Sequence, residues 1–248
     1  MEKSNIVLNT LVFDQQHQEG LSQADMLNKI TSFDLSTAEV RREYFTNIAD
    51  ETIAIAEQNK KLGLKLFYSV PETIFTKDGL LNPDLPKYFK EAETMGISSL
   101  KMNIGNFEAY SGNLASDLKP YSDAKIEFNI ENDQTELNGT INNISTFLNA
   151  VKQANIDIKF VFDLGNWRYV GQSENDAATK LHDFVRYIHV KNVLIDNNNK
   201  YAVVPLDKGV INWQETLRLL PSSLPIALEY PATDNEIRSG IQLLTSFN

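Results

Sequence analysis

The sequence predicts an α/β fold in which eight parallel strands, each followed by a helix, close into a single barrel. Strand-like runs alternate with helical patterns along all 248 residues. This length suits one such barrel, which usually takes about 250 residues. Four of the strand-like runs also end in a carboxylate or an imidazole, at steps close to one strand–helix unit of about 30 residues. We therefore expect residues 1–248 to form one domain.

The first half of the chain contains four strand-like runs and three helical patterns. We predict strands over residues 6–13, 37–43, 64–70 and 100–105, and helices over residues 21–33, 48–63 and 85–95. The first run is almost continuously apolar, as expected of a strand buried on both faces. Ser22 and Asp25 have the spacing of a capping box at the start of the first helix. Gly63 is expected to end the second helix, and Pro71 the third strand.

The second half repeats the same alternation. We predict strands over residues 126–131, 159–163, 187–191 and 226–230, and helices over residues 140–156, 174–184, from 212 onward and over 236–247. The helix over 140–156 is the clearest, because its apolar residues form one stripe. The polar connection over 106–123 is predicted to be weakly helical, and the three asparagines at 197–199 to form a loop tip. Eight strand–helix pairs in this length match the (β/α)8 TIM barrel.

Composition and charge exclude several classes of protein. The chain has a formal net charge of −10 at pH 7, which disfavours binding to nucleic acid or to an anionic membrane. No apolar run approaches the roughly 18–20 residues of a membrane span, and the first residues lack the apolar segment of a secretory signal. There is no cysteine, hence no disulfide framework and no zinc–thiolate site. We expect a cytoplasmic protein without nucleic-acid or membrane partners; its oligomeric state is not predicted.

Four polar residues end four successive strand-like runs. They are Glu131, Asp163, His189 and Glu229, separated by steps of 32, 26 and 40 residues. Because the carboxyl ends of barrel strands ring one mouth, their side chains are expected to meet there. Side chains alternate along a strand, so the preceding residues should face the helices. Those residues are all apolar, as this phase requires: Ile130, Phe162, Ile188 and Leu228.

Three carboxylates and one imidazole form a set of ligands suited to a divalent cation. Mn²⁺ is our favoured ion, and Mg²⁺, Co²⁺ or Zn²⁺ would also fit such a set. Without a cation, three neighbouring carboxylates would repel each other and raise each other's pKa values. For any one acid at a strand end, the alternative is a solvated charge or a salt bridge. Four such residues in phase favour a metal site.

Several short motifs resemble those of the xylose-isomerase-like TIM barrels, the sugar phosphate isomerase/epimerase family. They are A-E-V-R-R-E (38–43), I-E-N-D (130–133), F-D-L-G-N-W (162–167), Y-I-H-V-K-N (187–192), P-L-D-K-G-V-I-N-W (205–213) and A-L-E-Y (227–230). The resemblance implies that the four polar residues hold a divalent metal, and that the two glutamates move a proton, as in sugar-epimerising relatives. Three positions depart from the pattern: Asn166 replaces a histidine of many epimerases, Asn192 an aspartate and Asp207 a glycine. These departures separate the chain from the ketohexose 3-epimerases.

The chemistry predicted from this set is isomerisation or epimerisation of a small sugar or hydroxy-ketone through an enediolate. A carbon next to a carbonyl is too weak an acid for a carboxylate alone, so a metal must stabilise the developing oxyanion. Glu131 and Glu229 are expected to act as base and acid on that carbon. Asp163 and His189 are expected mainly to fix the ion.

Other residues are candidates for substrate binding. Lys101 and Lys191 share the inward phase, and each either holds a hydroxyl or phosphate of the substrate or pairs with Glu127 or Glu39. Asn166 stands at a substrate-binding position of the family. Trp167 forms either an apolar wall for a sugar ring or part of the core. Arg41 either reaches the mouth or pairs with Glu39 or Glu43. His17 and His182 are expected to be surface residues.

Three other functions remain alternatives. A metal-dependent dehydratase or lyase acting on a keto-inositol begins with the same proton abstraction. A barrel of this kind can also bind a sugar without turnover. The superfamily includes endonucleases acting at abasic sites, but these need a histidine-rich cluster of metals, and the chain has only three histidines. No G-x-G-x-x-G or G-x-x-x-x-G-K-[ST] sequence indicates a nucleotide site.

Overall fold

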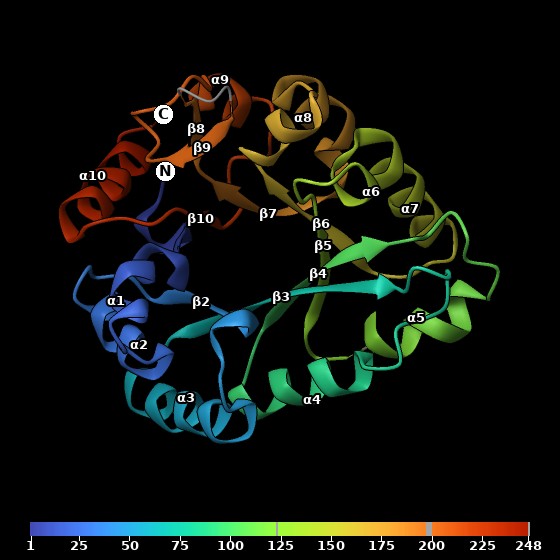
Figure 1. Cartoon of the computed structure of the whole chain (residues 1–248), viewed down its shortest axis with the longest axis horizontal. Helices are drawn as coiled ribbons and strands as arrows, with labels where there is room; N and C mark the ends of the chain where they lie inside the picture. The colour runs from blue at the N-terminus through green and yellow to red at the C-terminus, as the bar shows by residue number, and fades with distance from the viewer. Residues whose placement is uncertain (123, 197–199, 248) are drawn as a thin grey trace.

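Eight parallel strands form a closed barrel, which confirms the predicted (β/α)8 TIM-barrel fold (Figure 1). The structure is a computed structural model that describes residues 1–122, 124–196 and 200–247. Around the barrel the strands follow the order β1, β10, β7, β6, β5, β4, β3, β2. Their bounds are β1 Ile6–Asn9, β2 Thr37–Arg41, β3 Lys65–Phe75, β4 Ser99–Gly105, β5 Glu127–Glu131, β6 Ile158–Asp163, β7 Val185–Val190 and β10 Ile226–Leu228.

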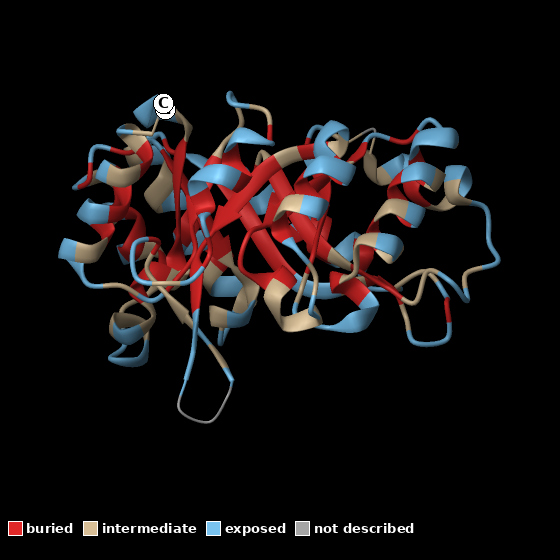
Figure 2. Cartoon of the chain, turned by 90° about the horizontal axis from the view of Figure 1, so that it is seen from above, coloured by how far each residue is buried: buried red, intermediate tan, exposed pale blue. Residues whose placement is uncertain are grey.

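Helices surround the barrel, and most of them bury one side against it (Figure 2). They are α1 Asp14–Gln18, α2 Gln23–Thr31, α3 Ile48–Leu62, α4 Leu85–Met95, α5 Leu114–Ser122, α6 Glu136–Gly139, α7 Ile141–Gln153, α8 Glu174–Leu181, α9 Trp213–Arg218 and α10 Asp234–Thr245. The two ends of the chain meet, since the amino group of Met1 donates to the carbonyl of Phe247 over 2.8 Å. Within the described residues, no helix combines the length and apolar character that crossing a bilayer requires.

The first two predicted strands, like the last two, end earlier in the structure than in the sequence pattern. β1 stops at Asn9, whose side chain accepts a hydrogen bond from the backbone of Leu11 and begins a 3-10 helix over Thr10–Phe13. β2 stops at Arg41, and a 3-10 helix over Arg42–Tyr44 follows it. The polar side chains at the two strand ends, Asn9 and Arg41, lie at the mouth of the barrel, where the backbone turns away.

Pro71 does not end the third strand, contrary to expectation. β3 continues to Phe75, but its pairing with β4 shifts register between Ser69 and Thr73. Proline has no N–H to donate to a neighbouring strand, so within sheets it is found where the regular strand pairing is interrupted. The register shift between β3 and β4 is such an interruption. The longer β3 extends the barrel wall beyond the mouth, so that Pro71 lines the pocket described below.

α5 occupies the second half of the polar connection at 106–123, in agreement with the weakly helical character predicted there; residue 123 lies outside the described part. Other elements were not predicted, among them α6, which precedes the predicted helix at 140–156. β8 (Asn192–Ile195) and β9 (Tyr201–Val204) pair antiparallel as a hairpin that projects beyond the barrel (Figure 2). The predicted asparagine loop tip at 197–199 also lies outside the described residues.

Side chains of the barrel strands form two separate cores, as the predicted alternation requires. A small inner layer fills the barrel below its mouth: Val7, Phe67, Val161, Tyr187 and Ala227. The larger core lies between the strands and the helices, and it includes the four predicted outward residues: Ile130, Phe162, Ile188 and Leu228. The inner layer is therefore a packed floor, above which the polar strand ends face the mouth.

Truncating the floor should destabilise the whole barrel. Phe67 is 2% exposed, and its ring meets that of Tyr187 edge-on with centroids 4.9 Å apart. We expect Phe67→Ala to lower the free energy of unfolding by about 3–5 kcal/mol, measured by chemical denaturation. Glu72→Ala, at an exposed position of the same strand, is the control and should change it by less than about 0.5 kcal/mol. Equal effects of the two substitutions would contradict this packing.

Candidate metal centre

Four strands bring Glu131, Asp163, His189 and Glu229 together at one mouth of the barrel. Glu131 and Asp163 are the last residues of β5 and β6. His189 is the penultimate residue of β7, and Glu229 directly follows β10. One ligand atom from each residue lies within 4.8 Å of the others, and all four residues are buried. The predicted convergence is thus found in the structure, while the binding of a metal stays a prediction.

The facing atoms of this cluster fit a divalent cation. His189 Nδ1 lies 2.6 Å from Glu131 Oε1 and 3.3 Å from Glu229 Oε2. Glu131 Oε1, Asp163 Oδ2 and His189 Nδ1 are buried, and each is in ion-pair contact with another of these groups or with Lys191. With bonds of about 2.0–2.2 Å, adjacent ligands of one ion lie about 3 Å apart and opposite ligands about 4.4 Å apart. The ligand atoms of this cluster, all within 4.8 Å of one another, are therefore close enough to share one ion. Oxygen and imidazole ligands match such ions.

Local hydrogen bonds fix the Asp163 carboxylate. Its Oδ1 accepts from the backbone N–H groups of Gly165 and Asn166, over 2.9 and 3.0 Å. The side chain of Asn132 bridges the backbone of Asp163, donating to its carbonyl over 3.0 Å and accepting from its N–H over 2.8 Å. A Cβ at Gly165 would lie 2.7 Å from Lys191 Cγ, so glycine also makes room for that side chain.

Three cationic side chains pair with the carboxylates of the cluster. Lys101 pairs with Glu131, and Lys191 lies 2.6 Å from Asp163 and 3.0 Å from Glu229. The predicted alternative partners of the two lysines, Glu127 and Glu39, were therefore wrong. Arg41 contacts both Glu43, at 2.5 Å, and Glu229, at 2.8 Å. It thus reaches the mouth and also forms one of its predicted pairs.

Burial and these pairs shift the pKa values of the cluster in opposite directions. Burial would raise the pKa of Glu131, but Lys101 and His189 outweigh it and lower the value to about 2. Burial is likewise outweighed at Glu229, where Lys191 and His189 hold the pKa well below its usual range. At Asp163 burial prevails over Lys191 and raises the pKa to about 7. Burial would lower the pKa of His189, but the surrounding carboxylates raise it well above its ordinary value.

A polar pocket of about 330 Å³ opens above the cluster. Its lining includes Glu131 and Glu229, each 4% exposed, whereas Asp163 and His189 are fully buried behind them. Most of the other lining side chains are charged or carry amides and a hydroxyl: Arg41, Lys101, Lys191, Asp133, Asn103, Gln134, Asn166 and Thr135. The two glutamates therefore face the pocket, while Asp163 and His189 lie behind them.

The remaining predicted substrate residues differ in their placement. Asn166 lines the pocket, where its amide donates to the carbonyl of Asn132 over 2.8 Å. Trp167 lies in the core, fully buried, with its ring 5.5 Å from that of Phe162. It does not line this pocket, so its position agrees with the packing alternative and not with a wall for a sugar ring. Asn192 joins the β8–β9 hairpin to the chain, donating to the carbonyls of Leu206 and Ile211.

Several residues that support the cluster were not among the predicted site residues. Glu39 contacts His189, and Asn132 fixes Asp163 as described above. Asn9 donates to Glu39 over 2.9 Å, and the Tyr187 hydroxyl donates to the same carboxylate over 2.8 Å. The inward phase of Glu39 was visible in the sequence, as was the position of Tyr187 two residues before His189. Their contacts cross the barrel, however, and a spacing along the chain does not reveal them.

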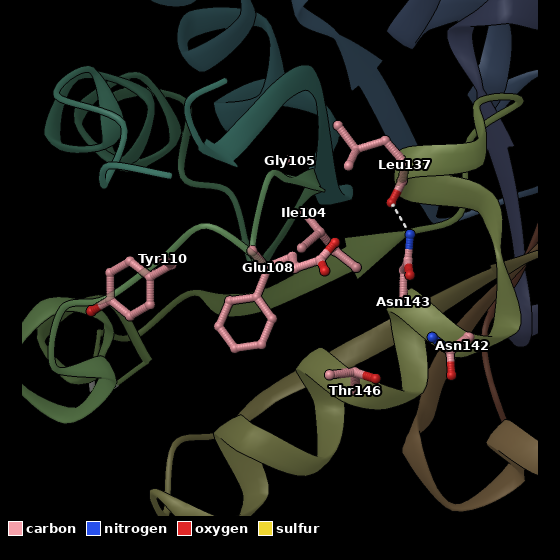
Figure 3. A pocket seen from close by; sticks show the side chains of 9 residues that line it. Ile104, Gly105, Glu108, Tyr110, Leu137, Asn142, Asn143 and Thr146 are labelled. Carbon is pink, nitrogen blue, oxygen red and sulfur yellow. Dashed lines mark hydrogen bonds between the residues drawn. The ribbon is translucent and has the colours of Figure 1, made fainter. Parts of the chain in front are cut away.

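A second cavity, of about 480 Å³, lies beside the connection after β4 and the helices α6 and α7 (Figure 3). Figure 3 shows the amide of Asn143 donating to the carbonyl of Leu137 at its edge, over 3.1 Å. Glu108 is the one carboxylate among the nine lining residues, and none of the nine is a histidine or lysine. The barrel mouth therefore offers more acid–base and metal-ligating side chains than this cavity does.

Comparison with known families agrees with this architecture. The sequence profile of the xylose isomerase-like TIM barrels matches residues 108–247, which is more than half of the chain. The chain belongs to the xylose isomerase-like TIM barrel family. This confirms the resemblance seen in the motifs, and the matched region contains all four residues of the cluster. By sequence, no curated protein matches the chain at a significant level.

Solved structures share the fold of this family member at low sequence identity. The probable 3-DHS dehydratase from Bacillus anthracis has a TM-score of 0.69 and 16% identity, with 98% of this chain and 99% of that chain covered. D-allulose 3-epimerase from Methylomonas sp., in complex with D-allulose, has a TM-score of 0.65 and 12% identity, with 98% of this chain and 96% of that chain covered. The IOLI protein with a binding zinc atom has a TM-score of 0.64 and 11% identity, with 98% of this chain and 96% of that chain covered. The neighbours thus include an epimerase and a dehydratase.

Metal uptake should release protons. A metal ion binds only deprotonated ligands, whereas the raised pKa values of His189 and Asp163 keep protons on the metal-free cluster near neutral pH. We expect calorimetric titration with Mn²⁺ at pH 7 to give enthalpies that depend on the ionisation enthalpy of the buffer. The affinity for Mn²⁺ should rise as the pH increases through the neutral range, because fewer of the ligands are then protonated. An enthalpy identical in phosphate and Tris buffers would contradict this protonation.

Proposed function

We propose that the chain is a divalent-metal-dependent isomerase or epimerase of a small sugar or hydroxy-ketone, acting through an enediolate. One observation carries the proposal: two glutamates face the pocket while an aspartate and a histidine lie fully buried behind them. This division matches the two tasks of such a site. Glu131 and Glu229 can reach a substrate, and Asp163 and His189 can only hold an ion.

The four side chains Glu131, Asp163, His189 and Glu229 would hold the metal, and Mn²⁺ is the ion we favour for this oxygen-rich set. One structural neighbour binds a zinc atom, which supports a divalent ion in a barrel of this fold. Zn²⁺, Mg²⁺ and Co²⁺ remain the alternatives to Mn²⁺. When bound, the ion would act as a Lewis acid that stabilises negative charge on oxygens of the substrate.

The two glutamates would transfer the proton at the carbon next to the carbonyl. Their neighbouring cations lower their pKa values and so keep both ionised, ready to act as a base, although a weak one. A weak base suffices only where the developing oxyanion is stabilised. The ammonium groups of Lys101 and Lys191 line the pocket beside the glutamates and would donate hydrogen bonds to that oxyanion or to neighbouring hydroxyls.

The pocket lining suits a polyhydroxylated ligand better than an apolar one. Amide and hydroxyl groups line it beyond the cluster, from Asn103, Gln134, Thr135 and Asn166, and these can donate to or accept from sugar hydroxyls. Pro71 is the one apolar residue in the lining. A structural neighbour bound to D-allulose supports the same class of ligand.

Two other functions would use the same site. A dehydratase would begin with the same proton abstraction and then expel water from the adjacent carbon, and a structural neighbour with dehydratase chemistry supports that alternative. A binding barrel would hold a sugar without exchanging its protons. Product analysis after the exchange experiment below separates these functions from isomerisation.

Exchange of substrate protons with solvent tests the proposal directly. We expect the Mn²⁺-loaded protein to incorporate deuterium from D₂O next to the carbonyl of one member of a panel of ketoses, inosose and hydroxypyruvate, as measured by NMR. Glu131→Gln and Glu229→Gln should each reduce the exchange rate at least 100-fold, because each removes a group that transfers the proton, a contribution of about 10²–10⁴.

The matched control is Glu127→Gln, at the exposed start of the same strand as Glu131. It should retain the wild-type exchange rate. Absence of exchange with every compound, while Mn²⁺ stays bound, would contradict the enediolate mechanism and favour a binding protein. Exchange accompanied by a dehydrated product would favour the dehydratase.

A further inference from the structure

Glu39 is a fully buried carboxylate on β2, outside the group of four ligands. It crosses the barrel interior and approaches the ring of His189 on β7, with Oε2 2.7 Å from Nε2. The opposite ring nitrogen, Nδ1, faces Glu131 and Glu229. The imidazole thus lies between one carboxylate that belongs to no ligand group and the cluster that would hold the metal.

Two neutral donors hold the Glu39 carboxylate in this position. The amide of Asn9 and the hydroxyl of Tyr187 donate to the same oxygen, Oε2, over 2.9 and 2.8 Å. His189 is the one cationic side chain in ion-pair contact with Glu39 among the described residues. Burying a carboxylate is costly unless it is paired with a charge and hydrogen-bonded, as Glu39 is here.

We propose that Glu39 is a positioning residue that orients His189 for metal binding by accepting the Nε2 proton, so that Nδ1 is presented to the ion. A carboxylate on the distal nitrogen of a histidine ligand fixes the tautomer and the ring orientation and makes the ligand more basic. This inference rests on the proposed metal centre. It adds a residue that touches neither the pocket nor the ion.

The alternative is that Glu39 only completes the packing of the barrel floor. Glu39→Gln separates the two roles because it keeps the shape and one acceptor oxygen. The three groups near Oε2, from Asn9, Tyr187 and His189, could all keep that acceptor. What the substitution removes is the negative charge beside the imidazole.

We expect Glu39→Gln to weaken Mn²⁺ binding by about 10–100-fold, measured by competition with a chelator at fixed pH. The matched control is Glu91→Gln. Glu91 is also a buried glutamate, 7% exposed, and it accepts from the hydroxyl of Tyr68 over 2.7 Å, but it pairs with Arg42, away from the cluster. This control should lose stability and keep the wild-type Mn²⁺ affinity.

A second readout responds to the position of the proton rather than to packing. The chain has three histidines, so ¹⁵N-labelled imidazoles give few signals, and a His189→Gln spectrum identifies those of His189. In the wild-type protein loaded with diamagnetic Zn²⁺, we expect a protonated Nε2 with a slowly exchanging hydrogen and a metal-bound Nδ1. In Glu39→Gln the Nε2 hydrogen should exchange faster and its signal should move.

The outcomes distinguish this inference from the proposed function. If the wild-type protein binds neither Mn²⁺ nor Zn²⁺, the metal centre itself is overturned. If the wild-type protein binds metal and Glu39→Gln binds it equally tightly, with unchanged Nε2 signals, only the role of Glu39 is overturned. An affinity loss in Glu91→Gln as large as in Glu39→Gln would assign the effect to folding and likewise reject the role of Glu39.

Discussion

The structure of the barrel mouth depends on one electrostatic constraint: carboxylates buried close together must be matched by positive charge. Four buried acids lie at this mouth or just below it, and each contacts a cationic side chain. Removing the cationic partner of a buried carboxylate leaves an unpaired buried charge. The resulting loss of stability exceeds the stabilisation that a surface ion pair provides. The acids are Glu39, Glu131, Asp163 and Glu229; the cations are Arg41, Lys101, His189 and Lys191.

The same constraint connects the metal-free protein to its proposed activity. The cationic side chains at the mouth pair with the buried carboxylates in the absence of a metal ion. We therefore expect that the barrel folds without a metal. Entry of a divalent ion would displace protons from its ligands and concentrate positive charge at one point of the cluster. A site with such concentrated positive charge suits a substrate that becomes an oxyanion during the reaction, which is the property expected of an enediolate pathway.

The strand period of two allows a few strands to supply all these groups. β2 presents Glu39 to the interior and Arg41 to the mouth, while β7 presents His189 and is followed by Lys191. Beneath them, the apolar floor around Phe67 and Tyr187 keeps the polar layer at one end of the barrel. β6, β7 and β10 thus each combine an inner residue of this floor (Val161, Tyr187 or Ala227) with a polar residue of the cluster at or directly after the strand end.

Sequence reasoning predicted the barrel because each element carries a local signal, such as the apolar stripe of α7 or the acid that ends β6. The convergence of four side chains also followed from alternation and spacing, since barrel topology turns strand position into spatial position. Contacts across the barrel, including Glu39 with His189, had no such signal. The continuation of β3 past Pro71 was missed because a register shift compensates for the absent N–H, and the β8–β9 hairpin was missed because its strands lie outside the barrel.

The most direct test of this account is an anomalous-difference map at the manganese edge from crystals grown with Mn²⁺. The account predicts one strong peak per chain at the barrel mouth, about 2.0–2.4 Å from ligand atoms of Glu131, Asp163, His189 and Glu229. No peak at this position, with Lys101 and Lys191 still in contact with the carboxylates, would contradict it.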